Sequence, residues 1–378
     1  MRIVFCIYDF SESQLPLQPW LTVRKVAEGL LSKGHDVHII TDIEQSASID
    51  GASIHTASSL RGSNGVQIKG MLSKLRPEVI ITLPTPLNIV TSSWLDAFLK
   101  CRRIGFASYP FYTIGELYRS AICLPWSDVK QYVRHALVPK PLWVSALKKR
   151  NDIVVTQSET TRSRLVNMGV KSERCCYIPP GINLDTWPQR DSYSTDGKIT
   201  KLLYLGSAIA IRGFNLVLEA LAKTNEPTIH LTVLARRAEG SELDRINALI
   251  DRYGLAERVV VHGGWADNST LVSEIQEADA VVLPFVLIPS ELPVTVMEAI
   301  ACGTPVIGSR VDGMPSTIGA AGTVVRQGDS GELAEVLLNF HNNPELRKTW
   351  ANGCIQQRAR MIEWDSVVEQ WEKVICDE

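Results

Sequence analysis

Short apolar runs alternate with amphipathic segments along nearly the whole chain, and this alternation restricts the fold more than any other feature. The amphipathic segments 21–33 and 160–168 have helical spacing, and each is followed by a glycine, Gly34 and Gly169. The apolar runs of the first half that are expected to form strands are 3–8, 36–41, 78–83, 104–108 and 152–157. Apolar strands that alternate with helices predict a parallel, doubly wound sheet.

The alternation stops once and then starts again. Residues 185–200 are polar and contain Pro188 and Gly197, which is typical of a linker. Beyond it, strands are expected at 202–206, 231–235, 259–263 and 280–284, with helices at 242–253 and 270–277. A chain of 378 residues is also long for one core. The sequence therefore predicts two Rossmann-like domains that face a central cleft, with ligands bound beyond the carboxyl ends of the strands.

Composition excludes several classes of protein. With 45% hydrophobic and 21% charged residues and a net charge of −2, the chain reads as globular, without the basic charge typical of nucleic-acid binding. No apolar run approaches the roughly twenty residues of a membrane span, and the N-terminus does not resemble a signal peptide. The eight cysteines are scattered without a Cys-x-x-Cys pair, so we expect reduced thiols, a cytoplasmic location and no metal site.

The segment 289–307 carries the most specific chemical signal. Pro293 cannot lie inside a helix, so Glu291 is expected in a loop and Glu298 about one turn into the helix that follows. The amides of residues 294–296 (Val294, Thr295, Val296) should then be unpaired at the helix start, where the helix dipole favours an anion. Two carboxylates for hydroxyl groups beside a helix start for phosphate indicate a site for a nucleotide sugar.

This segment, which ends in Glu-Ala-Ile-Ala-Cys-Gly-Thr-Pro-Val-Ile, resembles the paired-glutamate motif of the family 4 retaining glycosyltransferases. The resemblance covers nearly all of the second half and is weaker in the first. It implies the GT-B fold, an α/β architecture in which residues 1–190 bind the acceptor and residues 198–364 bind the nucleotide sugar. It also implies that a C-terminal helix, 365–378, crosses back to the first domain.

The segment 205–213 matches in length the family's loop that clamps the donor diphosphate through an arginine and a lysine. Arg212 stands at the lysine position, where it keeps the cation and adds a bidentate fork. Ser207, after Gly206, stands at the arginine position, so one cation is missing there. Arg236 or Arg237, at the end of the next expected strand, could replace it.

The two glutamates depart from the family spacing. Glu291 and Glu298 are seven positions apart, whereas the family has eight, and an alignment without a gap places Ser290 at the first acidic position. We favour a loop one residue shorter. Glu291 is then the catalytic-site acid that contacts the transferred sugar, Glu298 binds the ribose hydroxyls, and Ser290 remains a donor-site residue.

The acceptor side offers weaker signals. The first loop contains Asp9 and lacks the family's paired glycines, and Tyr109 and Phe111 stand where the family often has a histidine. We expect these three residues to contact the acceptor. The stretch 129–150 carries six Lys and Arg and no acid, with apolar residues between them. It predicts either a peripheral contact with the inner face of an anionic membrane or a solvated helical pair with an apolar core face.

The resemblance implies retention of the anomeric configuration through departure and attack on one face, with Arg212 and the helix amides stabilising the leaving diphosphate. It also implies transfer without a metal or cofactor, and the sequence has no Asp-x-Asp triplet. The acceptor could be a glycan, a lipid-linked sugar or a small molecule. Two alternatives stay open: a non-hydrolysing nucleotide-sugar epimerase, with Asp9, Glu12 or Glu116 as acid and base, and a degenerate subunit that binds sugar nucleotides without catalysis.

Overall fold

The computed structural model describes residues 1–377 except 59, 61–64, 194–198, 237 and 265. Its strands form two wholly parallel sheets of seven and six strands, in the orders β3-β2-β1-β4-β5-β6-β7 and β10-β9-β8-β11-β12-β13. The strands are β1 (Arg2–Cys6), β2 (Asp36–Thr41), β3 (Ser53–Thr56), β4 (Val79–Thr82), β5 (Arg102–Phe106), β6 (Ile153–Thr156), β7 (Cys175–Tyr177), β8 (Thr200–Leu205), β9 (Ile229–Arg236), β10 (Val259–Gly264), β11 (Ala280–Leu283), β12 (Val306–Ser309) and β13 (Gly322–Val325).

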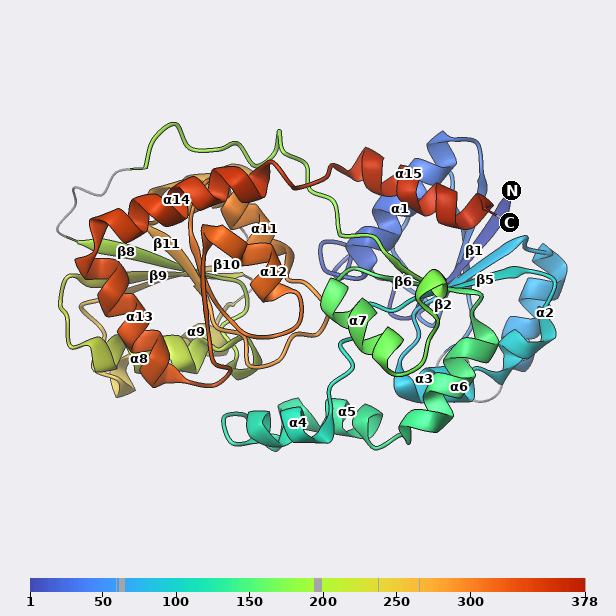
Figure 1. The fold of residues 1–378 in the computed structure, drawn as a ribbon, viewed down its shortest axis with the longest axis horizontal. Coiled ribbons are helices and arrows are strands. Elements are labelled where there is room, and N and C mark those ends of the chain that lie inside the picture. Colours follow the sequence, from blue (N-terminus) through green and yellow to red (C-terminus); the bar gives the residue numbers. More distant parts are fainter. Residues whose placement is uncertain (59, 61–64, 194–198, 237, 265, 378) are drawn as a thin grey trace.

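Helices cover both faces of each sheet, as parallel strands require (Figure 1). They are α1 (Trp20–Ser32), α2 (Val66–Leu75), α3 (Pro86–Thr91), α4 (Ile114–Ala121), α5 (Trp126–Ala136), α6 (Lys140–Arg150), α7 (Glu159–Asn167), α8 (Phe214–Thr224), α9 (Ser241–Arg252), α10 (Asn268–Glu277), α11 (Val294–Ala301), α12 (Met314–Ile318), α13 (Ser330–Asn342), α14 (Pro344–Arg358) and α15 (Trp364–Cys376). The expected strands and helices are present, with bounds that differ by up to two residues.

The final helix belongs spatially with the first sheet. Figure 1 shows α15 crossing from the second domain to lie beside α1, close to the N-terminus. Trp371 of α15 is 2% exposed and packs edge-on against Phe106 of β5, with ring centroids 5.3 Å apart. The predicted architecture of two Rossmann-like domains with a returning C-terminal helix is confirmed.

Each sheet reverses its strand order once, and these switch points locate the candidate sites. In the first sheet the reversal lies between β1 and β4, and in the second between β8 and β11. Loops that leave the carboxyl ends of neighbouring strands diverge at such a point, which opens a crevice for ligands. The loops after β8 and β11 carry Arg212 and Glu291, and α11 carries Glu298.

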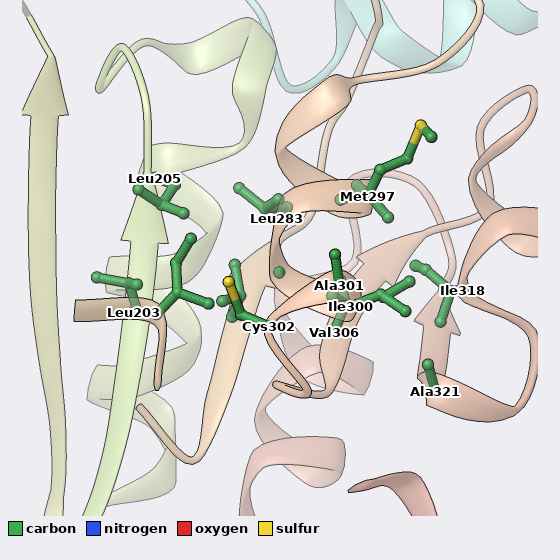
Figure 2. Close-up of a cluster of buried hydrophobic side chains, with 14 of the residues drawn as sticks. Leu203, Leu205, Leu283, Met297, Ile300, Ala301, Cys302, Val306, Ile318 and Ala321 are labelled. Atoms are coloured by element: carbon green, nitrogen blue, oxygen red, sulfur yellow. The ribbon is translucent and has the colours of Figure 1, made fainter. Parts of the chain in front are cut away.

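A large apolar cluster fixes α11 on its sheet. Ile300, Ala301 and Cys302 at the end of α11 are 0% exposed and pack among strand residues that include Leu203 and Val306 (Figure 2). Close-packed interiors resist small displacements, so the helix start is held rigidly over the switch point. The polar residues of α11 are therefore positioned by its apolar ones.

Candidate functional site

Helix α11 begins at a proline and leaves part of its first turn unpaired. Pro293 is the N-cap and supplies no side-chain hydrogen bond. The amide of Val296 donates to the Pro293 carbonyl at 3.1 Å, so this member of the predicted trio is already engaged. Among the described residues, the amides of Val294 and Thr295 have no acceptor. Two free amides, and not three, therefore remain at the positive end of the helix.

The same helix presents two buried polar side chains without partners. Thr295 and Glu298 are each 8% exposed and lie three residues apart, on one face of α11. The Thr295 hydroxyl and the Oε2 of Glu298 have no hydrogen-bond partner among the described residues. Buried polar groups are almost always paired with protein, ordered water or a ligand, so these two atoms mark a place for a bound water or ligand.

Two arginines act on Glu298 from neighbouring strands. Burial raises the pKa of Glu298, while the charges of Arg236 and Arg212 oppose that shift. Arg236 ends β9 and its Nε is buried and unpartnered among the described residues, whereas Arg212 follows β8. Burial also lowers the pKa of the Arg212 guanidinium, although an arginine remains charged at any physiological pH. The structure thus brings together three predicted donor-site residues.

The backbone of Gly206 makes room for Arg212. Gly206 has a φ of 111°, and a Cβ built on it would lie 1.9 Å from Nη1 of Arg212. The guanidinium also lies over the ring of Phe285, 5.3 Å from its centroid. A residue without a side chain at position 206 is therefore needed for Arg212 to occupy its place.

We expect Gly206→Ala to lower turnover at least about tenfold, because the new Cβ displaces the Arg212 guanidinium. Gly254→Ala is the matched control, since Gly254 also has a positive φ, 67°, but open space around it. Both variants should lose folding stability from the backbone conformation, and only Gly206→Ala should lose activity. Equal activities in the two variants, measured after thermal unfolding scans confirm folding, would contradict this role of Gly206.

A cavity of about 370 Å³ adjoins this cluster at the ends of β9 and β10. Arg236 forms one wall, and the other walls include His262, Gly263, Asp267 and Glu274. Its volume is within the range of small-molecule sites. The cavity can hold one part of a ligand while the charged groups of that ligand contact Arg236.

The other residues predicted for the donor site are Ser207, Ser290 and Arg237. Ser207 contributes its carbonyl to the hydroxyl of Tyr204 at 3.0 Å. Ser290 is 6% exposed, in the loop between β11 and α11. Arg237, the alternative to Arg236, lies outside the described residues.

Glu291 points into the first domain. Its Oε2 accepts from the amide of Gln157, just before α7, and its own amide donates to the carbonyl of Ser108 at 3.1 Å. Asp312 joins it there, since Ser158 Oγ donates to Asp312 Oδ1 at 2.6 Å. The second domain thus supplies two carboxylates to the start of α7. The catalytic role of Glu291 stays a prediction. In the structure its carboxylate bonds to the Gln157 amide and so links the two domains.

Burial, reinforced by the negative charge of Asp312, raises the pKa of Glu291 well above its usual range. The folded protein therefore keeps this proton at pH values where the unfolded chain has released it. The stability that comes from a neutral Glu291 is fully present below the unfolded pKa, roughly 4.3, and is lost as pH rises toward the folded pKa.

We therefore expect Glu291→Gln, which keeps an oxygen for the Gln157 amide, to be more stable than the parent at neutral pH. The difference should disappear near pH 4 and grow with pH by at most about 1.4 kcal/mol per unit. Urea unfolding across this pH range measures it, with Glu277→Gln as the control because Glu277 is exposed. A constant difference at all pH values would show that Glu291 is ionised in the folded protein.

A cavity of about 480 Å³ lies at the switch point of the first sheet. We call it the switch-point cavity; it is lined by Tyr8 after β1, by Thr85 and Asn88 at the start of α3, by α5, and by Pro289 of the second domain. Pro289 directly precedes Ser290, so the cavity adjoins the donor-side loop. An acceptor bound there would lie between the two domains.

A larger cavity, about 680 Å³, lies on the other side of Tyr109 and His135. We call it the aromatic cavity, because Phe111 and Trp143 stack in its wall with ring centroids 5.0 Å apart. Tyr109, a predicted acceptor residue, lines both cavities, while Phe111 lines only the aromatic one. Asp9, the third, lies in the loop after β1, where its amide donates to Asp42 at 2.6 Å; it lines neither cavity.

The stretch 129–150 forms parts of α5 and α6, separated at 137–139. Val129, Tyr132, Trp143 and Leu147 are buried, whereas Leu137 and Leu142 are exposed. Lys149 and Arg150 pair with Asp96. Two of the three acids named for an epimerase, Glu12 and Glu116, are also engaged. Glu116 belongs to the capping box of α4 and pairs with Arg164 at 2.8 Å, while Glu12 accepts from the amide of Ser48.

The described part of the chain has neither a membrane-spanning helix nor a metal site. None of its helices is long and apolar enough to traverse a bilayer. None of its groups of three or more His, Cys, Asp or Glu side chains is placed to hold a metal ion.

Sequence reasoning missed several residues that line these cavities. Thr85 and His262 lie at the carboxyl ends of β4 and β10, so the rule that ligands bind beyond strand ends could have found them. Tyr132 and His135 of α5 carried no such signal, because their place depends on how α5 packs against α3 and the second domain.

Known proteins resemble parts of this chain. Residues 185–357 match the family model described as glycosyl transferases group 1. The MMP alpha-(1->4)-mannosyltransferase of Mycolicibacterium hassiacum is 25% identical over 60% of this chain and 54% of its own length. A D-inositol 3-phosphate glycosyltransferase of Mycobacterium sp. (strain KMS) is 28% identical over 49% of this chain and 44% of its own length. The match thus spans about half the length of these curated relatives.

Solved structures resemble the chain along nearly its full length. Sucrose-phosphate synthase from Thermosynechococcus elongatus has a TM-score of 0.75 at 18% identity, covering 99% of this chain and 98% of its own. Anabaena HepE, solved in complex with UDP and glucose, has a TM-score of 0.72 at 15% identity, with 100% of both chains covered. The chain has the GT-B fold, and the comparisons together support a glycosyltransferase.

Proposed function

We propose that the chain transfers a sugar, with retention of configuration, from a nucleotide-sugar donor in the second domain to an acceptor hydroxyl held against the first. The observation that carries the proposal is the unpaired Oε2 of buried Glu298, on which the charges of Arg212 and Arg236 act, at the switch point of the second sheet. A carboxylate suits ribose hydroxyls and the arginines suit a diphosphate. The cavity beside Arg236 would take the rest of the nucleoside.

The residues divide the chemistry between them. Arg212, Arg236 and the free amides of Val294 and Thr295 would stabilise the diphosphate as it leaves, because they are positive groups fixed before the reaction. Ser207 and Ser290 border this site in the loops after β8 and β11. A double displacement would need a carboxylate nucleophile, and Glu291 is turned toward Gln157. That orientation favours departure and attack on the same face of the sugar.

The acceptor would enter from the switch-point cavity. Tyr8 and Thr85 line it with hydroxyl groups, and Pro289 joins the cavity to the donor-side loop. Holding the hydroxyl near the anomeric carbon supplies much of the rate enhancement in such a reaction. The structure of Anabaena HepE, a protein of similar fold, was solved with UDP and glucose, which supports a nucleotide-sugar donor for this chain as well.

A panel of radiolabelled nucleotide sugars tests the proposal, with transfer or slow donor hydrolysis as the expected result. We expect the activity to persist in excess EDTA, because arginines and helix amides supply the positive charge at the diphosphate. Loss in EDTA with rescue by Mg²⁺ or Mn²⁺ would overturn the metal-free mechanism. Formation of an epimer would replace the proposal with an epimerase, and binding without turnover would replace it with a non-catalytic subunit.

A further inference from the structure

The aromatic cavity opens on an apolar part of the surface. Ile114 and Leu137 line it and are 60% and 65% exposed, so they form its rim. From the rim, large apolar side chains continue over α4, the start of α5 and the start of α6. They are Tyr118, Ile122, Trp126 and Leu142, each 52–77% exposed. We call these six residues the α4–α6 edge.

This edge is unusual for the molecule. Six of the fifteen large apolar residues that the described chain exposes fall between 114 and 142, so they form a concentration and not a scatter. Figure 1 shows α4 and α5 along the lower margin of the molecule, with no element of the chain beyond them. A concentrated exposed apolar surface indicates an interaction site.

The charged residues around the α4–α6 edge indicate what kind of partner it contacts. Residues 113–150 carry seven Lys and Arg against two acids, in a chain whose net charge is −2. Glu116 is paired with Arg164, and Arg119, Lys130, Arg134 and Lys140 are exposed without an ion pair among the described residues. Exposed apolar and aromatic groups among free cations fit the headgroup region of an anionic bilayer.

The two residues that line both cavities, Tyr109 and His135, carry unpaired polar atoms. The hydroxyl of Tyr109 and the Nδ1 of His135 are buried and have no partner among the described residues. Burial, with the charge of Arg134, lowers the pKa of His135 to about 4, so the ring is neutral at neutral pH. A neutral imidazole and a phenol can each exchange a hydrogen bond with a polar group between a tail and a head.

We infer that the acceptor is an amphiphile taken from an anionic lipid surface, with its apolar tail in the aromatic cavity and its hydroxylated head in the switch-point cavity. The inference rests on the proposed function and names its acceptor class. The aromatic cavity is lined by Phe111, Trp143 and Met168, which suit an apolar chain. The head is then held beside Pro289, next to the donor loop.

The tail is tested with neutral probes, so that the charge of the edge does not contribute. Octyl β-D-glucoside, used below its micelle concentration, should bind measurably by calorimetry, and methyl β-D-glucoside should not. Each buried methylene of the octyl chain should raise the affinity by up to about fourfold. Asn167→Trp, at an exposed position that lines the aromatic cavity, should weaken octyl glucoside at least tenfold, and Asn167→Ala should not. Equal binding of both glucosides, or equal binding by both variants, overturns the tail site.

The edge is tested with vesicles. Co-sedimentation should require phosphatidylglycerol in phosphatidylcholine vesicles, weaken with salt, and fall at least tenfold in the double variant Ile122→Ser, Trp126→Ser. Leu99→Ser is the matched control, since Leu99 is 67% exposed and lies outside the edge. Binding that ignores phosphatidylglycerol, or no binding, overturns the lipid source. Nucleotide binding and donor hydrolysis, assayed in parallel, show separately whether the proposed function itself has failed.

Discussion

Glu298→Ala should lose donor binding by about 2–4 kcal/mol, which is roughly a 30- to 900-fold increase in the dissociation constant of the cognate nucleotide. The reason is the Oε2 of Glu298, which is buried one turn into α11 and has no partner among the described residues. In the complex we expect it to accept from the ribose hydroxyls. Calorimetric titration with UDP and GDP in turn measures the effect.

The same substitution should leave the fold intact or make it more stable. Burial raises the pKa of Glu298, so the folded protein bears a cost for holding an ionised carboxylate there. Removing the carboxylate removes that cost, and binding and stability should therefore change in opposite directions. Glu277→Ala, at an exposed position on α10, is the control for both measurements. Unchanged affinity would contradict the ribose assignment, and a large loss of stability would assign Glu298 to the core.

Arg212→Ala should lower turnover by about a hundred- to a thousandfold and affect donor affinity less. Negative charge grows on the diphosphate as the bond to the sugar breaks, so a fixed cation stabilises the transition state more than the bound donor. The placement of Arg212 between Gly206 and the ring of Phe285 indicates a guanidinium held before the donor arrives. Steady-state kinetics separate the turnover number from the Michaelis constant.

Arg212→Lys should recover part of the loss, because it keeps the charge but not the bidentate fork. Arg252→Ala is the control for a surface cation, since Arg252 is exposed on α9. If Arg212→Ala raises only the Michaelis constant and leaves turnover unchanged, Arg212 binds the donor without acting in the transition state.

The positions of Glu298 and Arg212 in the second domain could be predicted from the sequence, because the signals that place them are local. Pro293 places the start of α11 and thereby the fifth residue, Glu298, and the loop length after β8 places Arg212. The prediction that the Val296 amide is unpaired was wrong, because this amide donates to the Pro293 carbonyl as the first turn tightens.

Long-range contacts account for what could not be predicted. Glu291 and Gln157 are 134 positions apart, and their hydrogen bond depends on how the two domains meet. For 129–150 the sequence left open an apolar core face or a membrane contact, and it did not show which core such a face would meet. In the structure Val129 and Tyr132 pack against Leu216 and Leu287 of the second domain.

The return of α15 to the first sheet has a consequence for the order in which the chain can fold during synthesis. Trp371 and Ile375 complete a core that contains Ile3, Phe5 and Phe106, all of them made hundreds of residues earlier. The strands and helices of the second domain, residues 200–358, all precede α15 in the chain. The domain made first should therefore reach its native packing last, and it should remain sensitive to proteolysis until α15 has been made.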